Sequence, residues 1–340
     1  MSANKSREIR LKKRPVGLPV PSDFELVETA VPGPAAGQVL VRNIVMSVDP
    51  YMRARMTDRD SYLPAFRLGE ALSGRAVGQV AASNGNADFR VGDYVSHFSG
   101  WREWFTTDGS DLQKIDPALA PLSAYLGTFG MPGLTAYGGL LKVGEAKEGE
   151  RVFVSAAAGA VGSVVCQIAK NKGCYVVGSA GSDEKCDWLV KEAGFDAAID
   201  YKREKVGKAL SEHCKKGINI YFDNVGGEIL DDVLARIAFG ARIVLCGAIS
   251  QYNEMGVSMR GPKNYMNLVL RGARMEGFLV FQFASKNAQA IADLTKWHAE
   301  GKIINKIDLA HGLENCPKTI IRLFTGANFG KQLLKVADPQ

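Results

Sequence analysis

The amino-acid sequence predicts an α/β protein made of two parts, a partly open β-barrel of short antiparallel strands and a doubly wound, six-stranded parallel sheet. Two observations support this fold class. Apolar runs up to about residue 127 are short and interrupted by glycine and proline, whereas strand-like and helix-like runs alternate after it. We therefore expect one part to comprise residues 1–127 and 307–340, and the other to comprise residues 128–306.

The strands of the first part are predicted from short runs rich in valine and aromatic residues. These runs lie at residues 38–47, 74–83, 94–100, 101–107 and 111–115. The basic start of the chain, from Lys5 to Arg14, admits two interpretations: a targeting segment, or a first strand with one charged face. Because it lacks the apolar stretch of a secretory signal, we favour the strand.

The second part is predicted from alternating periods. Strands are expected at residues 151–156, 175–180, 197–200, 218–223, 242–248 and 274–280, and helices at 162–173, 183–194, 201–216, 226–240 and 288–301. Gly173 and Gly194 stand where helices commonly end. The alternation requires right-handed crossovers and hence a parallel sheet. The tail from about residue 307 has no place in this sheet, so we expect it to pack on the first part.

Composition and charge exclude several classes of protein. Most of the formal charge of +6 lies within the first fourteen residues, so the rest of the chain offers no extended basic surface for nucleic acid. No apolar run approaches the roughly 18 residues of a membrane-spanning helix. The 6 cysteines form no CxxC pair, and several lie in apolar runs. This usage favours a reducing, cytoplasmic location over a disulfide framework.

A loop containing glycine follows the first strand of the second part. In dinucleotide-binding folds this loop reads G-x-G-x-x-G, and its backbone approaches the pyrophosphate at the start of the next helix. Here Gly159 and Gly162 hold the second and third glycine positions, and Ala157 replaces the first. Because alanine resists a positive φ, the turn must differ slightly. The alternative is a purely structural strand-to-helix turn, but the further strand–helix units favour cofactor binding.

The end of the second strand indicates which dinucleotide binds. An NAD site usually has an acidic side chain there, which binds the ribose hydroxyls. This strand instead ends on Gly178 and Ser179, and Lys185 lies one turn into the following helix. Space and a cation favour the 2′-phosphate of NADP(H). In the alternative, Asp183 is the ribose acid and Lys185 a solvated lysine, but we expect Asp183 to be the N-cap of that helix.

Zinc chemistry is not expected, and we predict no metal site. A catalytic zinc needs a set of Cys, His and carboxylate ligands, and a structural zinc needs four clustered ligands. Residues 1–127 contain no cysteine and a single histidine, His97, which we interpret as a strand histidine satisfied by backbone groups. His213, His298 and His311 lie in polar contexts and are interpreted as surface residues. The remaining chemistry is direct hydride transfer to an activated acceptor.

Several stretches carry a resemblance to a known family, among them "NIVMSVDPYMRARM", "MPGLTAYGGL", "VFVSAAAGAVGSVVCQIAKNKGCYVVGSAGSDEK", "YFDNVGGEILD", "VLCGAISQYN" and "ANFGKQLLKV". Over nearly its whole length the chain resembles the zinc-independent medium-chain dehydrogenase/reductases, in the group of prostaglandin reductases (leukotriene B4 dehydrogenases), plant 2-alkenal reductases and bacterial curcumin reductases. The resemblance implies a GroES-like substrate domain, a Rossmann domain that binds NADPH/NADP+, a cleft between them and a homodimer. It also implies reduction of the C=C bond of small apolar enals and enones.

The resemblance also implies a set of site residues. The loop from Ala157 to Gly162 would hold the pyrophosphate, and Lys185 and Tyr201 the 2′-phosphate. Residues of the family's motifs would line the nicotinamide half, and Phe278 is expected in an apolar strand at the cleft wall. The expected cofactor contacts are Met131, Thr135, Ala157, Gly159, Ala160, Val161, Gly162, Gly181, Lys185, Tyr201, Asn224, Cys246, Gly247, Ala248, Tyr252, Phe278 and Asn328.

Two tyrosines are the candidate catalytic residues. Hydride addition to the β-carbon of an enone creates an enolate, and a phenol can donate a hydrogen bond to its oxygen. Tyr252 follows the fifth strand at the carboxyl end of the sheet, where ligands bind in such folds. It could instead pack on the cofactor alone, and Tyr51 could either contact substrate or fill the cleft. Residues 53–70 and 253–266 match the family least and are expected to shape the acceptor pocket.

Three classes of function stay open at this point. The first is an NADPH-dependent alkenal or alkenone reductase. The second is an NADPH:quinone reductase, because a quinone also accepts hydride without a metal. The third is a non-catalytic NADPH-binding protein. Turnover of a 2-alkenone and of a benzoquinone distinguishes them.

Overall fold

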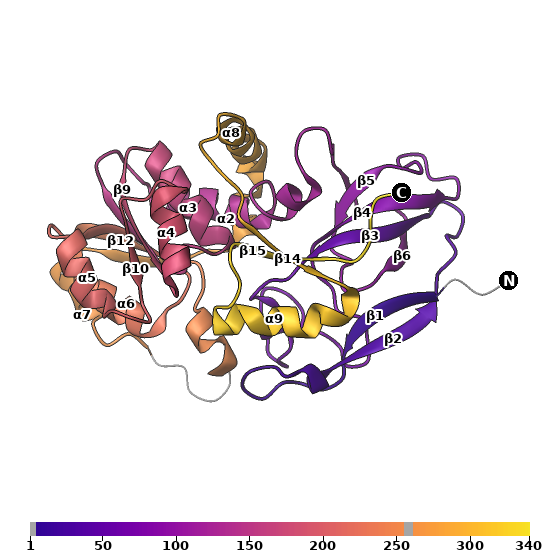
Figure 1. Cartoon of the computed structure of the whole chain (residues 1–340), viewed down its shortest axis with the longest axis horizontal. Helices are drawn as coiled ribbons and strands as arrows, with labels where there is room; N and C mark the ends of the chain where they lie inside the picture. Colours follow the sequence, from indigo (N-terminus) through magenta and orange to yellow (C-terminus); the bar gives the residue numbers. More distant parts are fainter. Residues whose placement is uncertain (1–4, 255–260) are drawn as a thin grey trace. The chain divides into compact units, whose positions relative to one another are not determined.

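The computed structural model describes residues 5–254 and 261–340. The chain divides into two compact units, each with its own core. The first unit comprises Met1–Leu126, Ile307–Asn328 and Gln332–Gln340, and the second comprises Gly127–Lys306 and Phe329–Lys331. Figure 1 shows the elements of each unit, and the tail after residue 307 supplies two strands to the sheet of the first.

The first unit is built from antiparallel strands, as predicted for a partly open barrel. The basic start of the chain forms strand β1, which pairs with β2 along its whole length. The other strands form a sheet in the order β14-β15-β3-β4-β5-β7, with β6 paired to β3. The strands span Lys5–Leu11 (β1), Phe24–Ala30 (β2), Val39–Ser47 (β3), Ala76–Ser83 (β4), Tyr94–His97 (β5), Trp104–Thr107 (β6), Gln113–Lys114 (β7), Ile307–His311 (β14) and Lys331–Lys335 (β15).

Short helices and an apolar cluster close the first unit. Trp101, Met46, Met52 and Leu72 are fully buried in this cluster, and helix α9 packs its apolar face there through Ile320. The helical segments are Pro21–Asp23 (η1), Met52–Arg55 (α1), Leu122–Leu126 (η2), Leu313–Asn315 (η6) and Cys316–Thr325 (α9).

The second unit contains the predicted six-stranded sheet, with every neighbouring pair parallel. Its order is β10-β9-β8-β11-β12-β13, that of a doubly wound fold. The strands span Arg151–Val154 (β8), Tyr175–Ala180 (β9), Ala197–Asp200 (β10), Ile218–Asp223 (β11), Ile237–Leu245 (β12) and Arg274–Gly277 (β13). The helical segments are Met131–Gly138 (α2), Gly139–Val143 (η3), Ala160–Asn171 (α3), Asp183–Lys191 (α4), Val206–His213 (α5), Gly227–Leu234 (α6), Ile249–Glu254 (η4), Met266–Leu270 (α7), Val280–Lys286 (η5) and Asn287–Ala299 (α8).

Three predictions of element type or extent were wrong. The helix expected over 226–240 ends at Leu234, and Ile237 begins strand β12 because it pairs with Ile218 of β11. The helix expected from residue 201 begins only at Val206. The strand expected to run to residue 280 ends at Gly277. The Gln282 side chain then accepts the Leu279 N–H and closes a helical turn.

Candidate functional site

The loop after β8 turns in a way that explains how alanine can replace its first glycine. The left-handed conformation falls on Ala156, with φ of 49°, and Ala157 avoids it. Ala157 is fully buried, and its N–H donates to the carbonyl of Ser179 on β9 at 2.8 Å. A Cβ on Gly162 would lie 2.4 Å from the carbonyl oxygen of Ala156, so helix α3 can start this close to the loop only with glycine there.

Helix α3 begins directly after this loop. Gly159 is its N-cap, and no side chain caps the helix. The N–H groups of Ala160, Val161 and Gly162 belong to the first turn, where a helix has no carbonyl of its own to bond. Such an N-terminus stabilises an anion through these N–H groups and the helix dipole. The loop can therefore hold a phosphate group.

A segment from the end of the chain braces the loop. The Gly330 N–H donates to the carbonyl of Ala158 at 2.9 Å, and Gly330 also forms a parallel bridge with Gly159. Gly330 has φ of 86°, and a Cβ there would lie 2.1 Å from the carbonyl oxygen of Lys306. This bracing segment, Phe329–Lys331, belongs to the second unit. It follows directly in sequence on Asn328, a predicted cofactor residue, which is the last residue of a segment of the first unit.

The turn after β9 contains the residues predicted for the 2′-phosphate. A Cβ on Gly181 would lie 2.8 Å from the hydroxyl oxygen of Tyr201, so these two residues lie in contact. The N-cap of α4 is Ser182, whose Oγ accepts the Lys185 N–H at 3.4 Å. The prediction that Asp183 is the N-cap was wrong by one residue. Asp183 is the first helical residue, and its carboxylate forms an ion pair with Arg203.

Asp223, at the end of β11, is a hydrogen-bonding hub at the same edge of the sheet. Its Oδ1 accepts bonds from the Tyr221 hydroxyl at 2.6 Å and the Ser155 hydroxyl at 3.1 Å. It also accepts the N–H groups of Val225 and Gly226, at 2.9 and 2.8 Å. Oδ2 is buried and has no hydrogen-bond partner among the described residues. Burial raises the pKa of Asp223, while these four donors oppose that shift.

Three loops meet around this hub. Asn224 donates its backbone N–H to the Ser155 hydroxyl at 2.9 Å and its side-chain amide to the Ser155 carbonyl at 2.8 Å. The N–H groups of Cys246 and Gly247 both donate to the Asp223 carbonyl. A Cβ on Gly247 would lie 2.7 Å from the hydroxyl oxygen of Tyr252. The predicted residues of "DNVGG", "CGA" and "SQYN" therefore lie together.

Three further predicted cofactor residues lie on the α2 side of the second unit. Met131 is the first residue of α2, and its carbonyl accepts the Thr135 hydroxyl at 2.7 Å. Phe278 packs against Phe222 and Phe283, with ring centroids 6.2 and 5.9 Å apart. It is partly buried in the core cluster of this unit. Ala248 lies instead beside the loop after β11, because a Cβ on Gly226 would meet its Cβ at 3.1 Å.

Tyr51 and His97 belong to the first unit. The Tyr51 hydroxyl is buried without a hydrogen-bond partner among the described residues, and burial together with Asp49 raises its pKa. It is therefore a protonated donor at neutral pH. The His97 Nδ1 accepts the Ser99 N–H at 3.0 Å, but Nε2 is buried without a partner among the described residues, so the backbone satisfies only one of the two ring nitrogens. Burial lowers the pKa of His97 to about 3, so it is neutral.

Sequence reasoning missed four residues that hold these loops together. Ser155 and Asp223 act through hydrogen bonds, Gly330 braces the pyrophosphate loop, and Arg203 pairs with Asp183. The alternation of Tyr221 and Asp223 was the one available signal, because a polar pair at i and i+2 of a buried strand shares one face. Within the described part of the chain, no three His, Cys, Asp or Glu residues are grouped to hold a metal ion. No helix in that part is long and apolar enough to span a bilayer.

The chain matches two protein families and several known reductases over most of its length. Residues 7–115 match a family described as the N-terminal domain of oxidoreductase, and residues 160–297 match one described as zinc-binding dehydrogenase. The chain is 41% identical to the NADPH-dependent curcumin reductase of Escherichia coli, over 99% of both chains. It is 42% identical to the NADP(+)-dependent 2-alkenal reductase of Nicotiana tabacum, over 98% of both. It is 43% identical to prostaglandin reductase 1 of Bos taurus, over 96% of this chain and 97% of the other.

Solved structures share the fold. The structure of CurA in complex with NADPH from Vibrio vulnificus superposes with a TM-score of 0.92 at 42% identity, covering 98% of this chain and 100% of the other. A quinone oxidoreductase of Pseudomonas syringae superposes with a TM-score of 0.75 at 26% identity, covering 97% and 99%.

Proposed function

Because the chain belongs to the medium-chain dehydrogenase/reductase family, in the group of prostaglandin, 2-alkenal and curcumin reductases, we propose that it uses NADPH to reduce the C=C bond of α,β-unsaturated aldehydes and ketones. The observation that carries the proposal is the identity of 41–43% with three such reductases, over nearly the full length of each. The physiological acceptor is proposed only as a small apolar enal or enone.

The carboxyl edge of the second unit's sheet fits NADPH in three places. The first turn of α3 would bind the pyrophosphate through the N–H groups of Ala160 to Gly162. The contact between Gly181 and Tyr201, with Lys185 in the first turn of α4, would take the adenosine end and its 2′-phosphate. Within the described part of the chain, the buried Asp223 Oδ2 and Ser179 Oγ have no hydrogen-bond partner, as expected beside a polar ligand.

When bound, NADPH supplies a hydride to the β-carbon of the acceptor. The protein must then stabilise the negative charge that develops on the acceptor oxygen. We propose that the Tyr252 hydroxyl, which lies beside Gly247, donates a hydrogen bond to that oxygen directly or through a water, or holds the nicotinamide ribose. Tyr51 is proposed as a second donor to the acceptor, because its buried hydroxyl has no hydrogen-bond partner among the described residues. The α-carbon then takes its proton from solvent.

An acceptor screen tests the function. With NADPH, a 2-alkenone and a 2-alkenal should be turned over faster than a benzoquinone, and the product should be the saturated carbonyl compound. Faster turnover of the quinone favours the NADPH:quinone reductase, a class also represented among the solved structures. Tight binding of NADPH without its oxidation by any of these acceptors favours a non-catalytic NADPH-binding protein.

The variant Tyr252→Phe tests the proposed donor. Loss of one hydrogen bond to a developing oxyanion reduces kcat by about 100-fold and leaves the Kd of NADPH within about twofold of the wild type. Loss of a hydrogen bond to the nicotinamide ribose instead raises the Kd of NADPH. Tyr175→Phe serves as the control, because Tyr175 begins β9 in the same unit, at the edge of the sheet opposite the proposed site. An unchanged kcat with the alkenone removes the Tyr252 hydroxyl from the chemistry.

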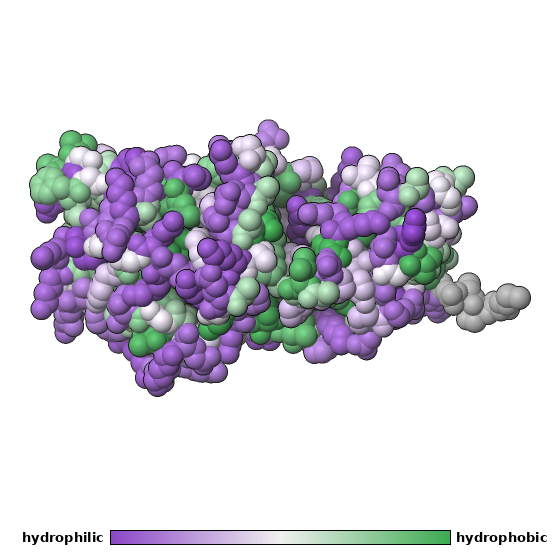
Figure 2. Space-filling view, turned by 90° about the horizontal axis from the view of Figure 1, so that it is seen from above, coloured by the Kyte–Doolittle hydropathy of each residue, from purple (hydrophilic) through white to green (hydrophobic). Residues whose placement is uncertain are grey.

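We also propose that the protein forms a homodimer through its second unit. Strand β13 is an edge strand, and Phe239, Val269 and Leu270 are 74%, 71% and 67% exposed nearby. An open edge beside exposed apolar residues is a typical interaction surface. In Figure 2, hydrophilic residues cover much of the drawn face, and a hydrophobic cluster is visible at its left end. Sedimentation of the wild type and of Val269→Glu tests this: the wild type should be a dimer and the variant a monomer.

A further inference from the structure

An ion pair lies at the proposed adenosine end of the cofactor site. Arg203, in the turn after β10, places Nη1 against Oδ2 of Asp183, the first residue of α4. The Arg203 Nε lies 3.8 Å from Oδ2 of Asp200 at the end of β10. The side chains of Arg203 and Asp183 are 69% and 59% exposed. An exposed pair of this kind adds little to stability, so its position calls for another explanation.

The position of Asp183 is unfavourable for NADPH unless its charge is balanced. It lies two residues after Gly181, which contacts Tyr201, and two residues before Lys185. Asp183 lies three residues beyond the last residue of β9, and its carboxylate would repel a 2′-phosphate bound at this turn. Arg203 lies in the turn after β10, two residues beyond Tyr201, and its guanidinium forms an ion pair with the Asp183 carboxylate.

We propose that Arg203 is a specificity-determining residue that neutralises Asp183 and so allows the turn after β9 to accept a 2′-phosphate. The inference rests on the proposed use of NADPH and adds a residue to that site. In this proposal Arg203 acts by neutralising the Asp183 carboxylate. Arg203 is therefore a positioning residue and does not contact the cofactor itself. Lys185 and Tyr201 keep the role of direct contacts.

The expected effect follows from Coulomb's law. A single uncovered carboxylate about 7 Å from a phosphate dianion in water weakens NADPH binding about fivefold to tenfold. NADH lacks the 2′-phosphate, so its affinity should change by less than about twofold. Because the groups are exposed, added salt screens the effect, and the difference between wild type and variant should shrink at 0.5 M salt, where the Debye length is only about 4 Å.

The experiment measures the Kd of NADPH and of NADH by fluorescence titration of the full-length protein. Four proteins form a double-mutant cycle: wild type, Arg203→Gln, Asp183→Asn and the double variant. Arg203→Gln should reduce the preference for NADPH about fivefold to tenfold, and the double variant should regain it. Lys191→Gln is the matched control, because Lys191 forms an exposed pair with Asp187 on the same helix. It should leave the preference unchanged.

Three outcomes overturn the inference. A preference for NADPH that Arg203→Gln changes by less than twofold removes Arg203 from cofactor selection. A double variant that binds NADPH as weakly as Arg203→Gln shows that Arg203 does not act through Asp183. If the wild type bound NADH and NADPH with equal affinity, the cofactor assignment in the proposed function and this inference would both be overturned. Measurements on the wild type alone would reveal this outcome before any variant is made. Thermal unfolding of each variant checks that the fold is retained.

Discussion

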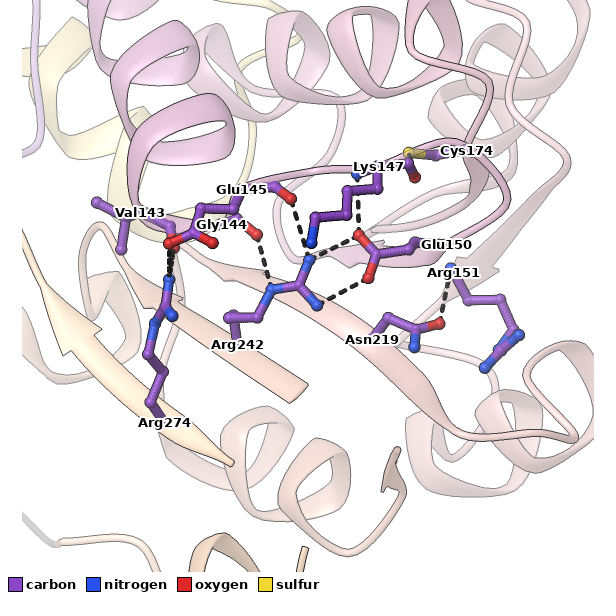
Figure 3. A network of polar contacts seen from close by, with 10 residues as sticks. All are labelled: Val143, Gly144, Glu145, Lys147, Glu150, Arg151, Cys174, Asn219, Arg242 and Arg274. Atoms are coloured by element: carbon purple, nitrogen blue, oxygen red, sulfur yellow. Dashed lines mark hydrogen bonds and ion pairs between the residues drawn. The ribbon is translucent and has the colours of Figure 1, made fainter. Parts of the chain in front are cut away.

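In the parallel sheet of the second unit, polar side chains are paired with one another at the edge where the strands begin, but at the carboxyl edge, where the strands end, some are unpaired among the described residues. At the edge drawn in Figure 3, where β8 and β13 begin, Arg242 donates to both carboxylate oxygens of Glu150, at 2.8 and 2.6 Å. It also donates to the Gly144 carbonyl, and Arg274 pairs with Glu145. At the other edge, Asp223 Oδ2 and Ser179 Oγ are buried without a partner among the described residues.

We interpret the paired groups as contributing to the stability of the fold and the unpaired groups as available for ligand binding. Charges that satisfy one another, as in the Arg242–Glu150 pair, strengthen a fold but leave nothing to offer a ligand. Polar atoms left unpaired, like Asp223 Oδ2, cost folding free energy and are retained where a ligand can use them. Doubly wound sheets bind ligands at the carboxyl ends of their strands, where Asp223 Oδ2 and Ser179 Oγ lie. The buried Asn171 Nδ2 also has no partner among the described residues, but it lies at the far end of α3. Variants at the two edges should therefore change different measurements.

The largest effect is expected for Gly162→Ala at the carboxyl edge. Its Cβ would lie 2.4 Å from the Ala156 carbonyl oxygen and 2.9 Å from the Ala157 Cα, so backbone must move. Moving the loop away from the first turn of α3 loses about two hydrogen bonds to a charged phosphate, worth about 3 kcal/mol or roughly 100-fold in the Kd of NADPH.

The matched control is Gly277→Ala, at the end of β13. A Cβ there would meet nothing within 4 Å, and its φ is not in the left-handed region. This variant should bind NADPH like the wild type. If Gly162→Ala also bound NADPH with unchanged Kd, the loop would be a purely structural turn, and the contrast between the two edges would lose its main support.

A smaller effect, and on a different quantity, is expected for Arg242→Gln at the opposite edge. The pair is mostly buried, with side chains 13% and 17% exposed, so the loss should lower the unfolding free energy by about 2 kcal/mol. The Kd of NADPH for the folded variant should not change. Arg274→Gln, whose pair with Glu145 is 45% and 52% exposed, should cost less than about 1 kcal/mol.

The Arg242→Gln effect should also depend on pH. Burial works to raise the pKa of Glu150, but Arg242 and the Lys147 N–H outweigh it and hold this pKa below 4.5. A carboxyl with a lowered pKa stabilises the folded state above its unfolded pKa, and the contribution is lost as pH falls through the folded pKa. Chemical denaturation should therefore give the full difference at pH 7 and a smaller one below about pH 4.5. A difference that grows on acidification would contradict this account.

The sequence predicted the strands of the sheet well and their surroundings less well. Apolar runs such as 218–223 identify buried strands because burial on both faces is a local property of composition. The predicted end of α6 was wrong because the helix is ended by the pairing of Ile237 with Ile218, which is a non-local contact. The Asp223 hub depends on Ser155 just after β8, on β11 and on the turn after β11, and Gly330 reaches the loop from 172 residues beyond Ala158. The hydrophobic periodicity of the sequence carries no information on contacts between residues so far apart in the chain.

A smaller effect than those of Gly162→Ala and Arg242→Gln is expected for Asp223→Asn, which tests whether the unpaired oxygen binds the cofactor. The amide Oδ1 can still accept the bonds of Ser155, Tyr221 and the turn, so the loops should stay in place. The amide group replaces Oδ2 and can no longer accept a hydrogen bond, so NADPH affinity should fall about tenfold, the worth of one bond. Tyr221→Phe is the control, because it removes a donor to Oδ1 and leaves Oδ2 untouched. It should lower the unfolding free energy by about 1 kcal/mol with little change in Kd. If both variants changed stability alone, Asp223 would belong with Arg242 as a structural group, and only the pyrophosphate loop would distinguish the two edges.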